Sequence, residues 1–304
     1  MRSKVPESTG WGFRSHQPRP SWGPGDAAID TTAGRSGWAG FWDHGRWWKA
    51  LVLAVGYLAI YEPASLLMAP FLPFIGDDDS TSYVIVLVVV PVLIGGLVLV
   101  GFGATVGWLR STFERQPIRG RGWMWTAIVV VLLFNVLRFA SIDYSAAGFD
   151  WVAAWLLAGL VIGFSEELLT RGYVVRIMRS SGRSEVAVGL VSAALFALLH
   201  GSNLFTGQAL GPTLLQMVYT FFFGFCMYLA LRVTRTILAP ILLHASTDPS
   251  IFMQGTHPVT GGIASLAQLG NIAVVLFGAV LLIVFLITER RARHRDQTAL
   301  SDSV

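Results

Sequence analysis

The stretch Gly163-Phe-Ser-Glu-Glu-Leu-Leu-Thr-Arg171 places two carboxylates and one guanidinium inside a long apolar run. An ion in hydrocarbon costs at least about 3 kcal/mol, so charges within such a run are a functional-site hypothesis by default. Their partners should be polar groups on other apolar runs. Two of those runs carry histidine, one ending in Phe196-Ala-Leu-Leu-His200 and one containing His244-Ala-Ser-Thr-Asp248. Together the three segments predict a polar site inside a membrane.

The composition is that of a membrane protein. Of 304 residues, 54% are hydrophobic and 13% are charged, and the mean hydropathy of +0.60 lies outside the soluble globular range. The basic residues cluster at the ends of apolar runs, which indicates membrane topology and excludes a nucleic-acid partner. The single cysteine, Cys226, excludes an intramolecular disulfide and a cysteine metal cluster.

Eight apolar runs follow a polar amino-terminal arm. Residues 1–46 are rich in Gly, Ser, Pro, Arg and Trp without periodicity, which predicts a disordered cytoplasmic arm. Backbone groups in lipid must be hydrogen-bonded within their own segment, so each run predicts a helix. The expected fold class is all-α, a polytopic membrane bundle of about eight transmembrane helices over 47–289, with a basic cytoplasmic tail at 290–304. The predicted spans are 48–75, 83–109, 123–140, 151–178, 185–200, 213–232, 236–253 and 267–288.

The arginines predict the orientation. Basic residues gather in alternate connections, and the positive-inside rule assigns that side to the cytoplasm. The other connections carry mainly aspartates, such as Asp77, Asp143 and Asp150. With an even number of spans, both termini lie in the cytoplasm. The basic connections contain Arg110, Arg115, Arg119, Arg121, Arg176, Arg179, Arg183, Arg232 and Arg235.

A depth calculation predicts that the three polar segments meet. Counted from the arginine-rich ends at about 1.5 Å per residue, the depths are roughly 20 Å for Glu166, 22 Å for His200, 13 Å for His244 and 20 Å for Asp248. These values differ by one or two helical turns and lie near the membrane centre. Phe196 and His200 share a helix face at i, i+4, as do His244 and Asp248.

The two glutamates are expected to have different roles. Glu167 and Arg171 stand at i, i+4 in the order that favours an ion pair, while Glu166 points about 100° away. Glu166 is therefore interpreted as the working carboxylate that faces the histidines, with the Glu167–Arg171 pair supporting it. A helical wheel leaves open whether the two glutamates exchange these roles.

This set of residues predicts hydrolysis. A glutamate beside histidines can take a proton from water, either unaided or while the histidines hold a divalent metal that acidifies the water. The sequence has neither a Gly-x-Ser-x-Gly elbow nor a His-Glu-x-x-His motif. Ser165 and Ser246 lie beside the motifs, but a serine nucleophile would need a dedicated base.

The motifs resemble those of the CPBP family, which comprises type II CAAX prenyl endopeptidases and bacteriocin-processing or bacteriocin-immunity proteins. The family pattern is Glu-Glu-x-x-x-Arg, then Phe-x-x-x-His, then His-x-x-x-Asn or Asp, and the resemblance covers about 125–255. It implies an intramembrane endopeptidase in which Glu166 and His200 activate water while His244 and Asp248 complete the site. The matching residues are Glu166, Glu167, Arg171, Phe196, His200, His244 and Asp248.

The resemblance also bears on a metal. Family members are classed as metalloproteases, although a metal-free glutamate mechanism has been argued for the prenyl endopeptidase branch. An ionised Asp248 would repel an oxyanion but is a natural metal ligand, which favours a divalent metal, with zinc as first choice. The ligand set would be Glu166, His200, His244 and Asp248.

The expected substrate is a membrane-associated peptide or protein, and the other expected partner is membrane lipid. The Arg-, Gly- and Trp-rich, Lys-poor composition points to a bacterial plasma membrane.

Two other functions remain open at this point. A proton-coupled transporter would use the same Glu and His residues as a relay and needs a polar path to both faces. A non-catalytic immunity or scaffold protein would keep the fold without turnover. Individually, His200, Asn135 and Asn203 each have a structural interpretation, and the Phe221–Phe225 run is interpreted as packing or lipid contact.

Overall fold

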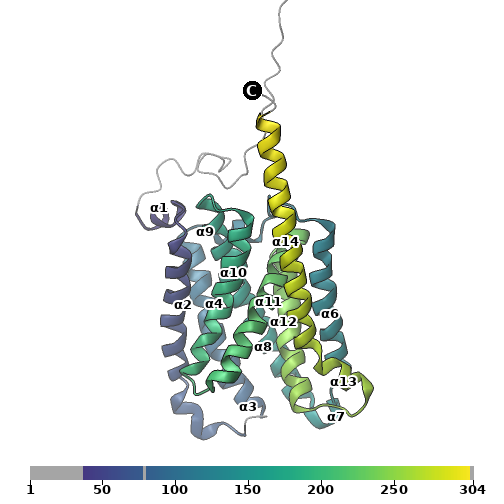
Figure 1. Cartoon of the computed structure of the whole chain (residues 1–304). Coiled ribbons are helices and arrows are strands. Elements are labelled where there is room, and N and C mark those ends of the chain that lie inside the picture. Colours follow the sequence, from purple (N-terminus) through teal and green to yellow (C-terminus); the bar gives the residue numbers. More distant parts are fainter. Residues whose placement is uncertain (1–36, 78–79, 302–304) are drawn as a thin grey trace, which may run out of the picture.

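The computed structural model describes residues 37–77 and 80–301, and all regular structure in these ranges is helical (Figure 1). The α-helices are α1 (Gly37–Asp43), α2 (Trp48–Leu66), α3 (Thr81–Tyr83), α4 (Val90–Thr105), α5 (Leu109–Phe113), α6 (Trp125–Phe139), α7 (Tyr144–Ala147), α8 (Phe149–Glu167), α9 (Val175–Ser180), α10 (Glu185–Leu199), α11 (Leu210–Thr234), α12 (Leu238–Thr256), α13 (Gly262–Gln268) and α14 (Gly270–Ser301). Short 3-10 helices are η1 (Ala69–Phe74), η3 (Gly122–Met124) and η5 (His200–Leu204), and π-helical turns are η2 (Val84–Val89) and η4 (Leu168–Val174).

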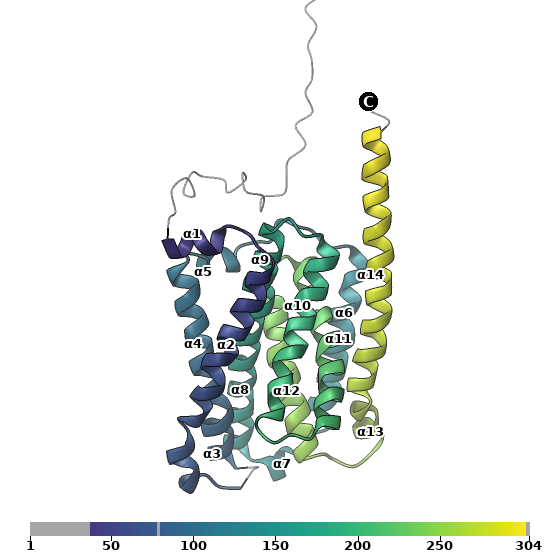
Figure 2. The ribbon, with the colours of Figure 1, turned by 60° about the vertical axis from the view of Figure 1, so that its left-hand side comes forward.

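The long helices form one bundle with roughly parallel axes. Helix α8 packs against α4 and α12, α10 packs against α11, and α14 packs against α6 and α11. The short helices α3, α7 and α13 lie at one end, while α1 and α9 lie at the other, where α14 extends beyond its neighbours (Figures 1 and 2). The all-helical bundle that the sequence predicts is therefore confirmed for the described residues.

Among the described residues, six helical segments are long and apolar enough to cross a membrane: Thr81–Thr105, Gly122–Phe139, Phe149–Ser180, Glu185–Leu204, Leu210–Thr234 and Gly270–Ala292. Helices also occupy the other two predicted spans, as α2 and α12, and lie within the bundle (Figure 2). Neither is among the six, so the predicted count of eight is not reproduced. The run from His244 to Asp248 makes α12 more polar than the six spans. His244 and Asp248 within this run belong to the predicted site.

The structure corrects the amino-terminal prediction in part. Residues 37–43 of the predicted disordered arm form α1, while residues 1–36 lie outside the described residues. The reason is aromatic packing. The Trp42 ring is buried and makes edge contacts with Phe102 at 5.0 Å and Trp108 at 6.5 Å between ring centroids. Bulky aromatic burial of this kind outweighs the Gly-rich composition that suggests disorder.

Close packing of two helices sets the position of the candidate site. Gly159 and Gly163 stand four residues apart on α8 and face α12. A Cβ on Gly163 would lie 2.7 Å from the amide nitrogen of Ala245 and 2.8 Å from the carbonyl oxygen of Ile241. Small residues at this spacing let two membrane helices approach with backbones nearly in contact. The approach brings the His244 turn of α12 against the end of α8.

One end of the bundle is tied by buried charges. Glu185 accepts hydrogen bonds from Arg179 and Arg232, each at 2.9 Å, and from Tyr228 at 2.6 Å. Arg179 also donates to Gln116 at 2.8 Å. This cluster joins α9, α10 and α11, so the basic connections predicted to share one side of the membrane do meet in space.

Candidate functional site

Glu166 and Glu167 lie at the point where α8 gives way to the π-helical turn η4. The segment from Phe149 to Ser180 is one continuous helical span, but residues 168–174 adopt π geometry and are all buried. Such turns are rare and recur at functional sites, because the extra residue changes the direction of neighbouring side chains. The sequence predicts an unbroken helix here and gives no signal for this turn.

Glu167 and Arg171 form a completely buried ion pair. The Arg171 Nη1 donates to Glu167 Oε1 at 2.9 Å, and both side chains have no exposed surface. Arg171 also donates to Thr170 and to the carbonyl oxygen of Gly224, each at 2.6 Å, and its guanidinium lies 4.7 Å from the Phe196 ring centroid. The ion pair that the sequence predicts is therefore present, and it is held from several sides.

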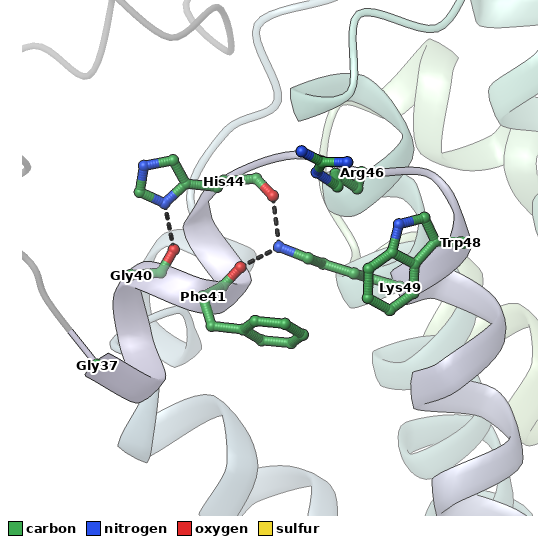
Figure 3. A pocket seen from close by; sticks show the side chains of 7 residues that line it. All are labelled: Gly37, Gly40, Phe41, His44, Arg46, Trp48 and Lys49. Carbon is green, nitrogen blue, oxygen red and sulfur yellow. Dashed lines mark hydrogen bonds between the residues drawn. The ribbon is translucent and has the colours of Figure 1, made fainter.

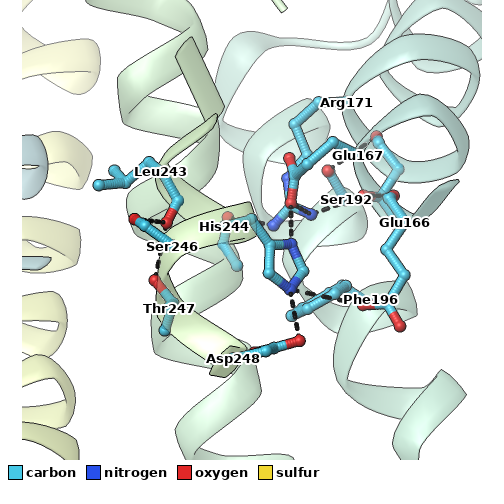
Figure 4. A network of polar contacts seen from close by, with 12 residues as sticks. Glu166, Glu167, Arg171, Ser192, Phe196, Leu243, His244, Ser246, Thr247 and Asp248 are labelled. Atoms are coloured by element: carbon cyan, nitrogen blue, oxygen red, sulfur yellow. Dashed lines mark hydrogen bonds and ion pairs between the residues drawn. The ribbon is translucent and has the colours of Figure 1, made fainter. Parts of the chain in front are cut away.

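His244 lies among three carboxylates (Figure 4). Its Nδ1 is 2.9 Å from Oε1 of Glu167. Its Nε2 is 3.4 Å from Oδ2 of Asp248 and 3.8 Å from Oε2 of Glu166. The imidazole makes edge contacts with the Phe196 and Phe223 rings at centroid distances of 5.6 and 5.0 Å. The hydrogen bond to Glu167 fixes the ring, and the second nitrogen is left facing the other two carboxylates.

Glu166 and Asp248 are the partly accessible carboxylates of this group. Their side chains are 22% and 24% exposed, whereas Glu167 is fully buried. Oε2 of Glu166 is itself buried and has no hydrogen-bond partner among the described residues. A buried polar atom without a partner is costly, so it marks a position suited to water or substrate. The predicted division of labour between Glu166 and Glu167 is consistent with this geometry, with the addition that Glu167 also holds His244.

His200 lies where α10 ends and η5 begins. Its Nδ1 is 3.0 Å from the carbonyl oxygen of Phe196, and the two rings are in edge contact at 5.0 Å. The Phe196 ring thus contacts both His200 and His244. The His200 imidazole also interacts electrostatically with Glu166. All six predicted site residues therefore belong to one neighbourhood, although His200 has no direct hydrogen bond to the other five.

Asn135 on α6 is connected to the site through the back of α12. Its Nδ2 donates to Ser246 Oγ at 2.9 Å, to Thr247 Oγ1 at 2.8 Å and to the Leu243 carbonyl oxygen at 3.4 Å. The sequence favours a structural role for Asn135 but does not identify its partner, because an amide in an apolar run can pair anywhere along a neighbouring helix. The other asparagine considered, Asn203, donates to Gln216 at 2.9 Å.

Two tyrosines of α2 also come near Glu166, and the sequence analysis missed them. Tyr57 and Tyr61 stack with ring centroids 5.6 Å apart and interplanar angle 11°. Both interact electrostatically with the Glu166 carboxylate. Their i, i+4 spacing in the first apolar run is the one signal that could have pointed to a shared face.

The sequence predicts a metal held by Glu166, His200, His244 and Asp248. Within residues 37–77 and 80–301, no group of three or more His, Cys, Asp or Glu residues is arranged to hold a metal ion. Nδ1 of His200 pairs with a carbonyl oxygen and Nδ1 of His244 with Glu167, which leaves Nε2 of each histidine as the donor that a metal could use. In this arrangement the four predicted ligands are not gathered around one point.

Comparison with known proteins identifies the segment that carries the site. Residues 148–249 match the family model described as type II CAAX prenyl endopeptidase Rce1-like. Curated proteins and solved structures give no match to the chain. The matched segment runs from the start of α8 into α12 and contains every predicted site residue. It confirms the resemblance seen in the motifs, over a shorter region than the predicted 125–255, since α6 lies outside it.

Proposed function

We propose that this chain is an intramembrane endopeptidase that hydrolyses a peptide bond of a membrane-associated peptide or protein. The observation that carries the proposal is the meeting of Glu166, His244 and Asp248 in front of the buried Glu167–Arg171 pair. The match of residues 148–249 to an endopeptidase family and the six apolar helices support the same conclusion. They favour it over a transporter or a scaffold.

Glu166 is the proposed general base. Its unpartnered Oε2 accepts a hydrogen bond from water, and the His200 imidazole holds the same water. The water oxygen bonds to the scissile carbonyl carbon while its proton passes to Glu166. That proton then moves to the leaving nitrogen as the C–N bond breaks. A positioned general base of this kind contributes about 10²–10⁴-fold in rate.

His244 and Asp248 complete the proposed site. Glu167 fixes the His244 ring through Nδ1, which leaves the Nε2 side directed at the reacting groups. Asp248 lies on the same side and stands where the family pattern allows Asn or Asp. Orienting a ring before reaction reduces the reorganisation needed in the transition state.

Zinc remains a proposed cofactor for experiment, with Glu166, His200, His244 and Asp248 as its ligands. No step above passes through a metal, because the donors do not converge on one point. A bound ion would require these four side chains to move together.

The test compares wild type, Glu166→Gln and a control variant, Glu114→Gln, whose carboxylate is 63% exposed and far from the site in sequence. Each purified protein is assayed for zinc and for cleavage of a quenched peptide library, with and without a chelator. We expect cleavage to fall by about 10²–10⁴-fold in Glu166→Gln and to persist in Glu114→Gln. Loss on chelation would assign a metal, and equal cleavage in Glu166→Gln and wild type would refute the proposal.

A further inference from the structure

An open cavity of about 410 Å³ lies between α1 and the start of α2, at the end of the bundle opposite α3, α7 and α13 (Figures 2 and 3). It is separate from the candidate active site. Its lining is basic and aromatic: Gly37, Gly40, Phe41, His44, Arg46, Trp48 and Lys49.

The wall formed by α1 is firmly attached to the bundle. Trp108 Nε1 donates to Asp43 Oδ1 at 2.7 Å, and Trp38 Nε1 donates to Thr105 Oγ1 at 3.1 Å. Trp42 is 4% exposed and packs into the core. A seven-residue helix would not be stable alone in water, so these contacts are what keep the cavity formed.

Lys49 and Arg46 give the cavity its positive charge. The Lys49 ammonium is directed at the cavity wall, where it donates to the carbonyl oxygens of Phe41 and His44 (Figure 3). Lys49 is only 2% exposed, so its charge acts on a ligand in the cavity through space rather than through a direct hydrogen bond. Arg46 is exposed, and its charge repels that of Lys49. Within the described part of the chain, neither side chain forms an ion pair with a carboxylate. An anion would therefore contact the exposed Arg46 directly and be attracted by the buried Lys49 charge, which the Asp43 carboxylate partly offsets.

An exposed apolar stripe begins at the cavity. Trp48, Leu51, Val52 and Val55 follow the i, i+3, i+4, i+7 pattern of one helix face and are 37%, 48%, 45% and 55% exposed. This face runs down α2 towards the membrane centre. A free phosphate would use the cavity alone, whereas a phospholipid would use the cavity and the stripe together.

We propose that this cavity binds the phosphate of one anionic phospholipid, whose acyl chain lies along the stripe on α2. Basic clusters beside a membrane helix attract anionic lipids by about 1 kcal/mol for each Lys or Arg. The surrounding tryptophans belong at the same depth, because indole rings favour the interface between headgroups and hydrocarbon.

The experiment titrates the purified full-length protein in detergent with phosphatidylglycerol and, separately, with phosphatidylcholine of the same chains, counting bound lipid by native mass spectrometry. We expect phosphatidylglycerol to bind more tightly. Arg46→Gln should weaken its binding by about fivefold, since one interfacial cation contributes about 1 kcal/mol. Arg46→Lys should retain binding because it retains the charge.

Arg110→Gln is the matched control, because Arg110 is 96% exposed and does not line the cavity. It should bind phosphatidylglycerol like wild type. Inorganic phosphate and glycerol phosphate are added as competitors, and we expect neither to displace the lipid at equal concentration. Equal losses in Arg46→Gln and Arg110→Gln, equal binding of the two lipids, or displacement by free phosphate would each overturn the proposal. Circular dichroism confirms that the variants keep the wild-type helix content.

Discussion

One imidazole ring, that of His244, connects the buried and the accessible parts of the site. On one side it meets Glu167, whose charge is already balanced by Arg171. On the other it meets Asp248 and Glu166, which are partly exposed. In the proposed reaction the buried pair would therefore act through the ring that it orients and through the electrostatic interaction of its charges with Glu166. Removing either member of the pair should disturb both stability and activity.

Arg171→Met should lower the free energy of unfolding by about 3–5 kcal/mol, because it leaves the Glu167 carboxylate buried without a partner. Denaturant titration of the purified protein followed by circular dichroism measures the change. Glu166→Gln is the comparison, since the Glu166 carboxylate is 22% exposed and has only a long contact of 3.8 Å to His244, so it should change stability much less. Similar stability of Arg171→Met and wild type would show that the pair is not structurally important.

Asn135→Ala should weaken the attachment of α6 to α12. Interhelical hydrogen bonds in membranes contribute about 0.6 kcal/mol on average, and the two N–H groups of the Asn135 amide are shared among three acceptors. We expect a loss of about 1–2 kcal/mol. A double-mutant cycle with Thr247→Val isolates the bond at 2.8 Å. Asn203→Ala paired with Thr247→Val should give no coupling energy.

The sequence predicted which residues lie together at the candidate site better than it predicted their contacts. Charges in apolar runs are informative because a membrane selects strongly against them, and this is why Glu166, Glu167, Arg171, His244 and Asp248 could be assigned together. Tyr57, Tyr61 and Asn135 could not, since tyrosine and asparagine are tolerated in helices for many reasons and only the fold shows what they face.

At the scale of the helices, the contact between α8 and α12 determines whether the site can form. The sequence predicted both helices. Their contact depends on Gly159 and Gly163, and a glycine in an apolar run does not indicate which helix will pack against it. The π-helical turn η4 was also beyond prediction, because π and α geometry differ by one residue in one turn.

Gly163→Ala should separate α8 from α12. The added methyl would lie 2.7 Å from a backbone nitrogen of α12, and backbone cannot move aside as a flexible side chain can. Overpacking of this kind costs about 1–3 kcal/mol, and we expect cleavage to fall as His244 moves away from Glu167. Gly255→Ala on α12 is the control, because nothing lies within 4 Å of the added methyl. Thermal unfolding and peptide cleavage measure both effects.

At the scale of the whole molecule, the two ends of the bundle differ in charge. The end with α9 carries the Glu185 cluster with Arg179 and Arg232, and the sequence assigns this end to the cytoplasm. The described residues contain six clear spans, with α2 and α12 lying alongside them. The predicted orientation therefore depends on the positions of the arginines and not on the number of spans.

Single engineered cysteines test the orientation. Arg183→Cys lies between α9 and α10, and Thr206→Cys lies in the connection at the other end; both positions are exposed. A membrane-impermeant maleimide applied to intact cells should label Thr206→Cys and leave Arg183→Cys unlabelled. Native Cys226 is buried and gives little background. The reverse labelling pattern would invert the topology.

The π-helical turn also sets the helical phase of a 32-residue segment. An extra residue in one turn shifts everything beyond it by about 100° around the axis. In the half before the turn, Gly159 and Gly163 face α12. In the half after the turn, Arg179 reaches Glu185. A straight α-helix with the same residues could satisfy only one of these alignments. Deleting one residue from 168–174 would therefore remove the extra residue and let the two halves keep both alignments on a plain α-helix, whereas deleting one residue elsewhere in the segment would place them out of phase.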